Sequence, residues 1–459
     1  MYKINFKQPV HVHFIGIGGI SMSGLAKILL KEGFTVSGSD NKESALTDSL
    51  ADAGAVIFYG QKASNIIQGI NVVVYTAAIH DDNEEFMAAK EKNLPMLSRA
   101  ELLGQLMTNY KFPIAVSGTH GKTTTTSMLS HILLANDMDP TISVGGILKA
   151  IGGNIRVGDS DFFVTEACEY TNSFLHFLPK ISIILNIDED HLDFFKDLDD
   201  IRSSFRKFAE LVPADGYLVI NGEIDCCEDI MKGLPCKVIT YGHSSSMNYS
   251  ASNISHNSKG EASFDFIKDG VFTERIHLSV NGDHNVSNAL AALAVADQLG
   301  VPVGISQKGL KSFSGTTRRF EYKGERDGVT IIDDYAHHPT EITATLAASR
   351  HYPHREIWCV FQPHTYTRTK ALFGEFVESL SHTDHIILAD IYAARETDTL
   401  GVSSEDVARA LRDKGCDAYF FKNFKDIEKF CVENCKKGDL LITMGAGDVV
   451  TIGENLLQK

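Results

Sequence analysis

The stretch AVSGTHGKTTTTSMLS, residues 115–130, continues the apolar run FPIAVSG and leads into a predicted helix. A strand, a glycine-rich loop and a helix in this order are typical of a phosphate-binding loop. Gly118 and Gly121 allow backbone N–H groups to approach phosphate oxygens, and Lys122 supplies a positive charge. Thr123 offers a hydroxyl group to Mg²⁺. The stretch therefore predicts a nucleotide site in an α/β domain.

The loop departs from the usual spacing, which places a glycine five positions before the glycine of Gly-Lys-Thr. That position is Val116 here, and Gly118 stands only three residues before Gly121. His120 and the four threonines of residues 123–126 are also unusual. Threonine is a mediocre helix former, but its hydroxyl suits a first turn that faces a ligand. The alternative is a capped helix with a chance Gly-Lys-Thr, and the order of the elements favours the nucleotide site.

The rest of the chain alternates between apolar strands and amphipathic helices, which predicts parallel sheets in an α/β fold. The first part reads as a Rossmann-like domain, with the strands VHFIGIGG, TVSGSD and NVVVYTAA. A second unit begins near FPIAVSG and a third near FSGTTRRFE. We therefore predict three domains: a Rossmann-like domain at residues 1–111, a central P-loop ATPase domain at 112–313 and a Rossmann-like C-terminal domain at 314–459.

The composition limits the function further. The 459 residues carry 43 Lys and Arg against 59 Asp and Glu, a net charge of −16, which disfavours nucleic acid and anionic membranes as partners. No apolar run approaches the roughly 18 residues needed to span a bilayer. Histidines interrupt the apolar N-terminal stretch, so we do not expect a signal peptide. The eight cysteines include no CxxC, which indicates reduced thiols and a cytoplasmic location.

The first glycine-rich loop, GIGGISMSG, only partly matches a dinucleotide-binding pattern. Gly16 and Gly18 fit its start, but Ser21 stands at the third glycine position. Asp40 lies at the end of the second predicted strand, where dinucleotide folds place a ribose-binding carboxylate. The loop favours a nucleotide diphosphate on the helix N-terminus. NAD and a purely structural turn remain open.

Other polar residues follow the predicted strands, where ligands bind in open α/β sheets. Glu166 and His191 are candidate metal ligands in a protein with a P-loop, whereas Glu169 and Asp190 fit either ligands or caps. Asn285 and Asn288 could pair with adenine, although one of them could be the helix N-cap.

The segment DDYAHHPTE, residues 333–341, contains adjacent histidines. We expect no shared zinc site there, because neighbours on a strand point to opposite faces. Arg318 and Arg319 suit an anion or a surface ion pair, and His364 and Arg368 follow a later strand.

Nine motifs in order carry a resemblance to a known family: GIGGISMSG, SGTHGKTTT, EACEYTNSFL, DEDHLDFF, HNVSNALAA, TTRRFE, DDYAHHPTE, FQPHTYTRT and DIYAARE. The chain resembles the Mur ligases of peptidoglycan synthesis over its full length. The resemblance implies ATP-dependent ligation of L-alanine to the lactyl carboxylate of UDP-N-acetylmuramate through an acyl phosphate. ATP and Mg²⁺ are the implied cofactors, and the protein is expected to be a monomer or homodimer.

The resemblance also implies roles for individual residues. The expected ATP-binding residues are Gly118, Thr119, His120, Gly121, Lys122, Thr123, Thr124, Asn285, Asn288, Arg319 and Asp334. The expected contacts to the UDP-substrate are Gly16, Gly18, Gly19, Ser23, Asp40, His120, Asn172 and Ser173. The expected amino-acid site is Tyr335, His337, His364 and Arg368. The expected metal ligands are Thr123, Glu166 and His191, and the catalytic set is Lys122, His191, Arg319 and His337.

The sequence departs from the family pattern at three positions: Cys168 and Tyr170 replace the usual Asp and Ser, and Thr365 replaces an Arg. No equivalent of the carbamylated lysine of related ligases is assigned, although Lys207 is available. One alternative function is a ligase that adds a preformed tripeptide to the same UDP-sugar. An NAD-dependent oxidoreductase or a non-catalytic nucleotide-binding protein would leave several of the motifs unused.

Overall fold

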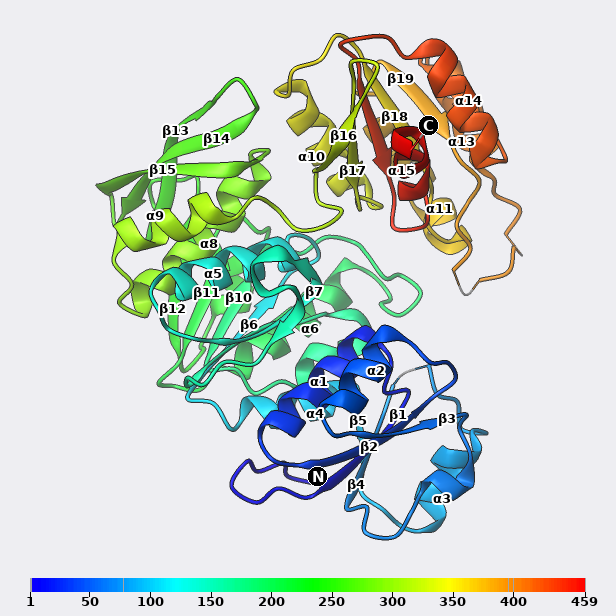
Figure 1. The fold of residues 1–459 in the computed structure, drawn as a ribbon. Coiled ribbons are helices and arrows are strands. Elements are labelled where there is room, and N and C mark those ends of the chain that lie inside the picture. Colours follow the sequence, from blue (N-terminus) through cyan, green and yellow to red (C-terminus); the bar gives the residue numbers. More distant parts are fainter. Residues whose placement is uncertain (1, 77, 395, 399, 459) are drawn as a thin grey trace. The chain divides into compact units, whose positions relative to one another are not determined.

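The computed structural model describes residues 2–76, 78–394, 396–398 and 400–458 (Figure 1). Contacts divide the chain into two compact units. The first unit consists of Met1–Ile187, Ile201–Thr240 and Ala294–Val301. The second unit consists of Asp188–Asp200, Tyr241–Leu293 and Pro302–Lys459. Among the described residues, no helix is both long enough and apolar enough to cross a bilayer.

The first unit begins with a parallel five-stranded sheet in the order β3-β2-β1-β4-β5. The strands are β1 (His11–Ile15), β2 (Thr35–Asp40), β3 (Val56–Tyr59), β4 (Val72–Tyr75) and β5 (Met96–Ser98). The helices are α1 (Ile20–Lys31), α2 (Ala45–Asp52), η1 (Ala63–Asn65), α3 (Glu84–Glu91) and α4 (Arg99–Met107). Figure 1 shows α1 and α2 on one side of the sheet and α3 on the other. The apolar central strands explain this arrangement, because parallel sheets are covered on both faces.

The first unit continues with strands in the order β12-β11-β10-β6-β9-β7-β8. They are β6 (Phe112–Ser117), β7 (Thr141–Leu148), β8 (Gly153–Arg156), β9 (Phe162–Glu166), β10 (Ile181–Ile184), β11 (Tyr217–Asn221) and β12 (Lys237–Gly242). The helices are α5 (Lys122–Ala135), η2 (Lys149–Ile151), η3 (Tyr170–His176), α6 (Leu198–Glu210) and α7 (Cys227–Met231). Strand β6 pairs in parallel with β9 and β10, so three strand ends meet beside the phosphate-binding loop.

Within the second unit, three antiparallel strands precede two helices. The strands are β13 (Tyr249–His256), β14 (Glu261–Lys268) and β15 (Val271–Asn281). The helices are α8 (His284–Gln298), which continues into the first unit, and α9 (Val303–Ser312). The sequence analysis did not predict these strands.

The C-terminal part of the second unit is a six-stranded sheet in the order β16-β17-β21-β18-β19-β20. Its strands are β16 (Glu321–Arg326), β17 (Val329–Asp334), β18 (Ile357–Phe361), β19 (His385–Leu388), β20 (Asp417–Phe420) and β21 (Leu440–Met444). Its helices are α10 (Pro339–Arg350), α11 (Tyr366–Ala371), α12 (Phe373–Leu380), α13 (Ser404–Asp413), α14 (Phe424–Asn434) and α15 (Val450–Gln458).

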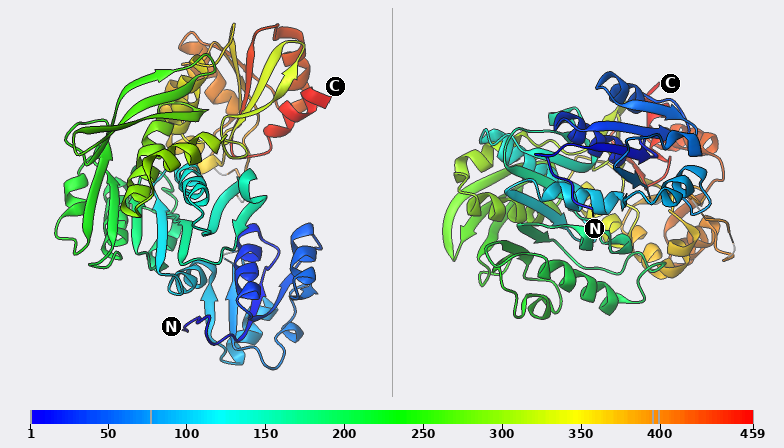
Figure 2. Two further views of the ribbon diagram at one scale, coloured as in Figure 1. Left: turned by 60° about the vertical axis from the view of Figure 1, so that its left-hand side comes forward. Right: turned by 90° about the horizontal axis from the view of Figure 1, so that it is seen from below.

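The C-terminal sheet is parallel except for β16, and helices lie on both sides of it (Figure 2). One face packs Ile342, Phe376 and Val407 of α10, α12 and α13 into its core. The other face packs Ile427 of α14 and Ile452 of α15. The predicted α/β class, with Rossmann-like sheets flanking a P-loop domain, is confirmed.

Candidate functional site

The first glycine-rich loop connects β1 to α1, and Gly19 is the N-cap of that helix. The N–H groups of Gly16 and Ile17 both donate to the Ser39 carbonyl at 2.9 Å. The Gly18 N–H donates to Oδ2 of Asp40 at 2.9 Å. Gly16 has φ +84°, and a Cβ there would lie 2.8 Å from Thr76 Cγ2. The loop is therefore a rigid turn in which Asp40 holds the backbone in shape.

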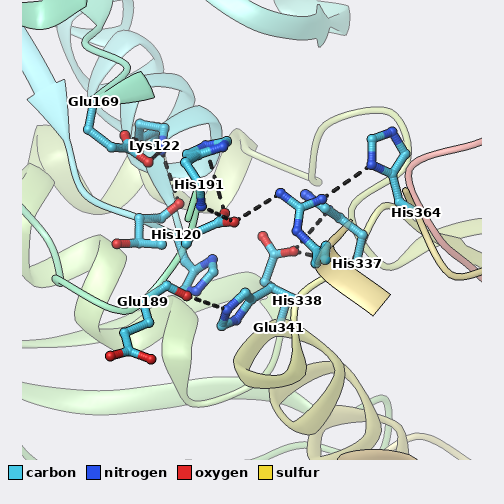
Figure 3. A network of polar contacts seen from close by, with 12 residues as sticks. His120, Lys122, Glu169, Glu189, His191, His337, His338, Glu341 and His364 are labelled. Atoms are coloured by element: carbon cyan, nitrogen blue, oxygen red, sulfur yellow. Dashed lines mark hydrogen bonds and ion pairs between the residues drawn. The ribbon is translucent and has the colours of Figure 1, made fainter. Parts of the chain in front are cut away.

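The phosphate-binding loop connects β6 to α5, which begins at Lys122. Gly118 and Gly121 have φ +142° and +84°, so glycine is required at both positions. Lys122 Nζ donates to the carbonyls of Gly118 and Thr119 and to Glu169 Oε2, the last at 3.0 Å (Figure 3). Burial lowers the pKa of Lys122, but Glu169 and other anionic neighbours outweigh this and raise it overall. The lysine is therefore held as a cation.

Thr123 follows this lysine in the first turn of α5. Its Oγ1 donates to Glu166 Oε2 at 3.0 Å, and the other Glu166 oxygen accepts from the Gly145 N–H. A hydroxyl and a carboxylate side by side form a hard oxygen set that suits Mg²⁺. Glu169, which fitted either a ligand or a cap from sequence, is instead the ion-pair partner of Lys122.

Asn186 supports the same loop from the end of β10. Its Oδ1 accepts from the His120 N–H at 2.7 Å, and its Nδ2 donates to the His120 carbonyl at 3.0 Å. Sequence analysis missed this asparagine, which lies two residues after the end of β10. Thr125 and Thr126 are fully buried, so packing explains the part of the threonine run that had no ligand role.

Asn172 and Ser173 lie in η3 of the first unit. Asn172 has φ +56°, and its Oδ1 accepts from Ser204 Oγ. Ser173 Oγ donates to the Tyr170 carbonyl at 2.8 Å. The predicted contacts of these two residues to the UDP-substrate stay predictions, as does that of Ser23, which is buried in α1.

In the second unit, the Arg368 side chain contacts Asp190 and His364. Its Nη2 donates to Asp190 Oδ1 at 2.9 Å, and its Nη1 lies 3.2 Å from His364 Nδ1. The Nε of Arg368 is buried and has no hydrogen-bond partner among the described residues. Burial raises the pKa of Asp190, but Arg368 and the neighbouring His191 hold it well below its usual range. Burial and the neighbouring His337 and Arg368 lower the pKa of His364 to about 4.

A second cluster surrounds Glu341, which sequence analysis did not assign to the site. The His337 N–H donates to Glu341 Oε2 at 3.1 Å (Figure 3). Arg319 Nη1 donates to Glu341 Oε1 at 3.4 Å. The His337 Nδ1 atom lies 2.9 Å from the Tyr335 carbonyl and 3.2 Å from Glu341 Oε2. Both of these atoms are acceptors, so Nδ1 carries a proton, and in the neutral ring the lone pair is on Nε2. The four-residue spacing of His337 and Glu341 at a helix start was the available signal.

The adjacent histidines are not on a strand, which corrects the reasoning from sequence. Strand β17 ends at Asp334, and His338 is the N-cap of α10. His338 Nε2 lies 2.9 Å from the Glu189 carbonyl, and its Nδ1 accepts from the Thr340 N–H. Within the described ranges, no group of three or more His, Cys, Asp or Glu side chains could hold a metal ion.

The side chains of Arg318 and Asp334 form hydrogen bonds with nearby backbone groups. Arg318 has φ +61°, pairs with the buried Asp333 at 2.9 Å and donates to the carbonyls of Gly445 and Gly447. Asp334 accepts from the N–H groups of Phe320 and Ala336, both at 2.7 Å. Burial, opposed by Arg319, raises the pKa of Asp334 to about 6.

Asn285 and Asn288 both lie inside α8, so neither is its N-cap and that alternative was wrong. Asn288 Nδ2 donates to Asn285 Oδ1 at 3.0 Å, and Asn285 Nδ2 donates to the Asn281 carbonyl at 2.7 Å. The two amide groups are therefore fixed relative to each other. Their pairing with adenine stays a prediction.

Two glycine-rich loops at helix starts, one of them followed by Lys122 and Thr123, define the class of an α/β nucleotide-binding protein. Three family models match the chain: "Mur ligase family, catalytic domain" over residues 11–111, "Mur ligase middle domain" over 116–296 and "Mur ligase, glutamate ligase domain" over 318–447. The chain belongs to the Mur ligase family.

Individual relatives cover the whole chain. It is 60% identical over 459 residues to a UDP-N-acetylmuramate–L-alanine ligase of Agathobacter rectalis, covering 100% of both chains. An enzyme of the same name from Lachnospira eligens is 59% identical over the same length, again covering 100% of both. The crystal structure of UDP-N-acetylmuramate-alanine ligase from Thermotoga maritima matches with 29% identity and a TM-score of 0.80, covering 98% of each chain. The oxidoreductase alternative is not supported, because the matched family consists of ligases.

A structural relative with a different name is also found. A murein peptide ligase from Psychrobacter arcticus matches with 26% identity and a TM-score of 0.69, covering 98% of each chain. The fold is therefore shared by ligases of both names.

Proposed function

We propose that this protein joins L-alanine to the lactyl carboxylate of UDP-N-acetylmuramate at the expense of ATP, in peptidoglycan synthesis. The observation that carries the proposal is the phosphate-binding loop, where Lys122 pairs with Glu169 and Thr123 with Glu166. Full-length relatives at 60% and 59% identity carry the name of this activity, which supports the choice of substrates.

The reaction begins with phosphoryl transfer. A lactyl carboxylate oxygen attacks the γ-phosphorus of ATP, the bond to the β-phosphate oxygen breaks, and ADP leaves. Lys122 neutralises the charge on the transferring group, and Arg319 adds a second cation. Mg²⁺ would supply further charge neutralisation when held by Thr123, Glu166 and His191. The remaining ATP contacts in the proposal are Asn285 and Asn288 for adenine and Asp334 for the ribose.

Amide formation follows. The alanine amine attacks the carbonyl carbon of the acyl phosphate, and inorganic phosphate leaves. His337 suits the removal of the ammonium proton, because its Nε2 keeps a lone pair while Glu341 supports the protonated ring. Arg368 binds the alanine carboxylate with its remaining N–H groups, and Tyr335 and His364 complete the pocket.

The UDP-sugar is proposed to bind in the first unit. Its pyrophosphate would lie on the glycine-rich loop at the start of α1, with Asp40 holding that loop. His120, Asn172 and Ser173 would contact the muramoyl group. The proposed domain boundaries are residues 1–111, 112–313 and 314–459, and the proposed location is the cytoplasm.

A phosphate-release assay with UDP-N-acetylmuramate, ATP and Mg²⁺ tests the proposal across L-alanine, L-serine, glycine and a stem tripeptide. We expect release that requires the UDP-sugar and is fastest with L-alanine. A clearly higher kcat/KM for the tripeptide would replace the proposal with the tripeptide ligase. No release with any amine would favour a non-catalytic nucleotide-binding protein.

A further inference from the structure

Arg99 is a charged side chain that the functions proposed above do not use. It is the first residue of α4, directly after the N-cap Ser98. Its Nη1 donates to Ser21 Oγ at 3.2 Å, and Ser21 is in the first turn of α1, beside the glycine-rich loop. Both residues belong to the first unit. The guanidinium is therefore located at the helix end where an anion is expected to bind.

The nearest acid on the same helix is not the partner of Arg99. Ser98 and Glu101 form a capping box, in which Glu101 Oε2 accepts from the Ser98 N–H at 2.7 Å and Ser98 Oγ accepts from the Glu101 N–H. This double contact commits the carboxylate to the backbone. It also fixes the start of α4, so the direction of the Arg99 side chain is constrained.

Arg99 differs in charge pairing from other arginines of the described chain. Arg156, Arg206 and Arg368 each form an ion pair with an aspartate or a glutamate. No carboxylate of the described residues pairs with Arg99, and the Ser21 hydroxyl is its hydrogen-bond acceptor. Burial lowers the pKa of Arg99, which reflects the cost of placing a cation there. A partly buried guanidinium with N–H groups to spare calls for an anionic ligand.

The charge of Arg99 also acts near the phosphate-binding loop. Burial and Glu169 raise the pKa of the Cys168 thiol, whereas Lys122 and Arg99 oppose that rise. The opposing effect of Arg99 means that its charge acts at the loop after β9, next to the carboxylate that holds Lys122. Arg99 therefore contacts the first turn of α1 through Ser21 and is close enough to Cys168 for its charge to act there.

We propose that Arg99 binds an oxyanion of the UDP-sugar, either its pyrophosphate or its lactyl carboxylate. The planar guanidinium fork fits both groups, and it leaves Ser21 as a neutral support. The inference rests on the proposed function, because that function supplies the ligand. It makes Arg99 a binding residue that orients the sugar between the two loops.

Calorimetric titration of Arg99→Ala and Arg99→Lys with three ligands tests the proposal. UDP carries the pyrophosphate, UDP-N-acetylglucosamine adds the sugar, and UDP-N-acetylmuramate adds the lactyl carboxylate. We expect Arg99→Ala to bind UDP-N-acetylmuramate about 10- to 100-fold more weakly, as for the loss of hydrogen bonds to a charged group. A loss for all three ligands identifies the pyrophosphate, and a loss for UDP-N-acetylmuramate alone identifies the carboxylate.

Arg206→Ala is the matched control, because Arg206 also lies in the first unit but pairs with Glu210 on its own helix. We expect wild-type affinities for all three ligands in this variant. Binding of an ATP analogue reports the folding of the Arg99 variants, and Arg99→Lys keeps the charge if the alanine variant is unstable. Unchanged affinity of both Arg99 variants for all three ligands, with wild-type binding intact, would overturn the inference alone. A wild-type protein that binds none of the three would overturn the proposed function as well.

Discussion

At the scale of single residues, Lys122 is the side chain on which the proposed chemistry depends most directly. We expect Lys122→Ala to lower kcat by at least about 10²-fold, the loss typical for removal of one charge-stabilising donor. UDP-N-acetylmuramate affinity should change little, because the proposed contacts to that ligand are other residues. Phosphate release and calorimetry measure the two effects, with the exposed Lys149→Ala as control. Loss of UDP-sugar binding together with turnover would argue against the division of roles.

His337 gives a second prediction at this scale. Its Nδ1 is fixed by Tyr335 and Glu341, so Glu341→Gln should leave the ring in place but weaken support for its protonated form. We expect a lower kcat and an altered pH–rate profile, with the KM for ATP close to that of the wild type. An unchanged pH–rate profile would remove His337 from the proton transfer.

His364 makes the stability of the protein depend on pH. Its pKa falls to about 4 in the folded protein, below the ordinary value of 6.5. Between these two pH values the unfolded chain binds a proton that the folded protein does not, so His364 lowers stability as the pH falls. Urea unfolding from pH 7.5 to 4.5 should show the wild type losing stability relative to His364→Asn. Parallel curves for the two proteins would contradict the assignment.

At the scale of elements, Gly104 controls how α4 packs on η3. A Cβ at Gly104 would lie 1.9 Å from the backbone carbonyl oxygen of His176, so alanine forces the two elements apart. We expect Gly104→Ala to cost about 1–3 kcal/mol of unfolding free energy, as overpacking does. It should also raise the KM for UDP-N-acetylmuramate, because η3 carries Asn172 and Ser173.

Gly374 in α12 is the matched control, since nothing lies within 4 Å of a Cβ built there. Alanine at this position should be neutral or stabilising, because glycine is a poor helix former. Equal melting temperatures for the Gly104→Ala and Gly374→Ala proteins would show that the backbone at His176 can move away from the added methyl group without loss of stability.

The elements that sequence predicted well are those with continuous apolar runs. Strands β6, β10, β18 and β21 are buried on both faces, and their continuous apolar residues are typical of a strand inside a parallel sheet. Strand β14 was missed because only every second residue is buried, with polar residues between them. Such a pattern needs partner strands to become visible as a sheet.

The site was predictable where a motif carries the chemistry and was missed where partners come from distant segments. The loop around Lys122 was read from its own residues. The contacts of Asn186 to His120 and of Glu341 to Arg319 became evident only from the fold, because a hydrogen bond between distant positions leaves no spacing to count. The adjacent histidines were misread because the end of β17 at Asp334 was placed too far along the chain.

At the scale of the whole molecule, the proposed reaction uses residues of both compact units. Lys122 and Thr123 belong to the first unit, and Arg319 and Arg368 belong to the second. We expect ATP and UDP-N-acetylmuramate together to reduce the radius of gyration measured by small-angle X-ray scattering, because phosphoryl transfer requires closure over the reacting groups. UDP alone should leave it unchanged, since its proposed contacts lie in one unit. Identical scattering in all states would exclude closure in solution.

The contacts of Lys122 also affect the free energy of nucleotide binding. Its ammonium group has two backbone carbonyls and a carboxylate as acceptors. A phosphate oxygen that arrives exchanges one acceptor for another and does not meet a bare charge. The contribution of Lys122 to ATP affinity is then small, because its ammonium group is hydrogen-bonded both before and after the nucleotide binds. Its stabilisation of the transition state is larger, because more negative charge faces the same ammonium group there.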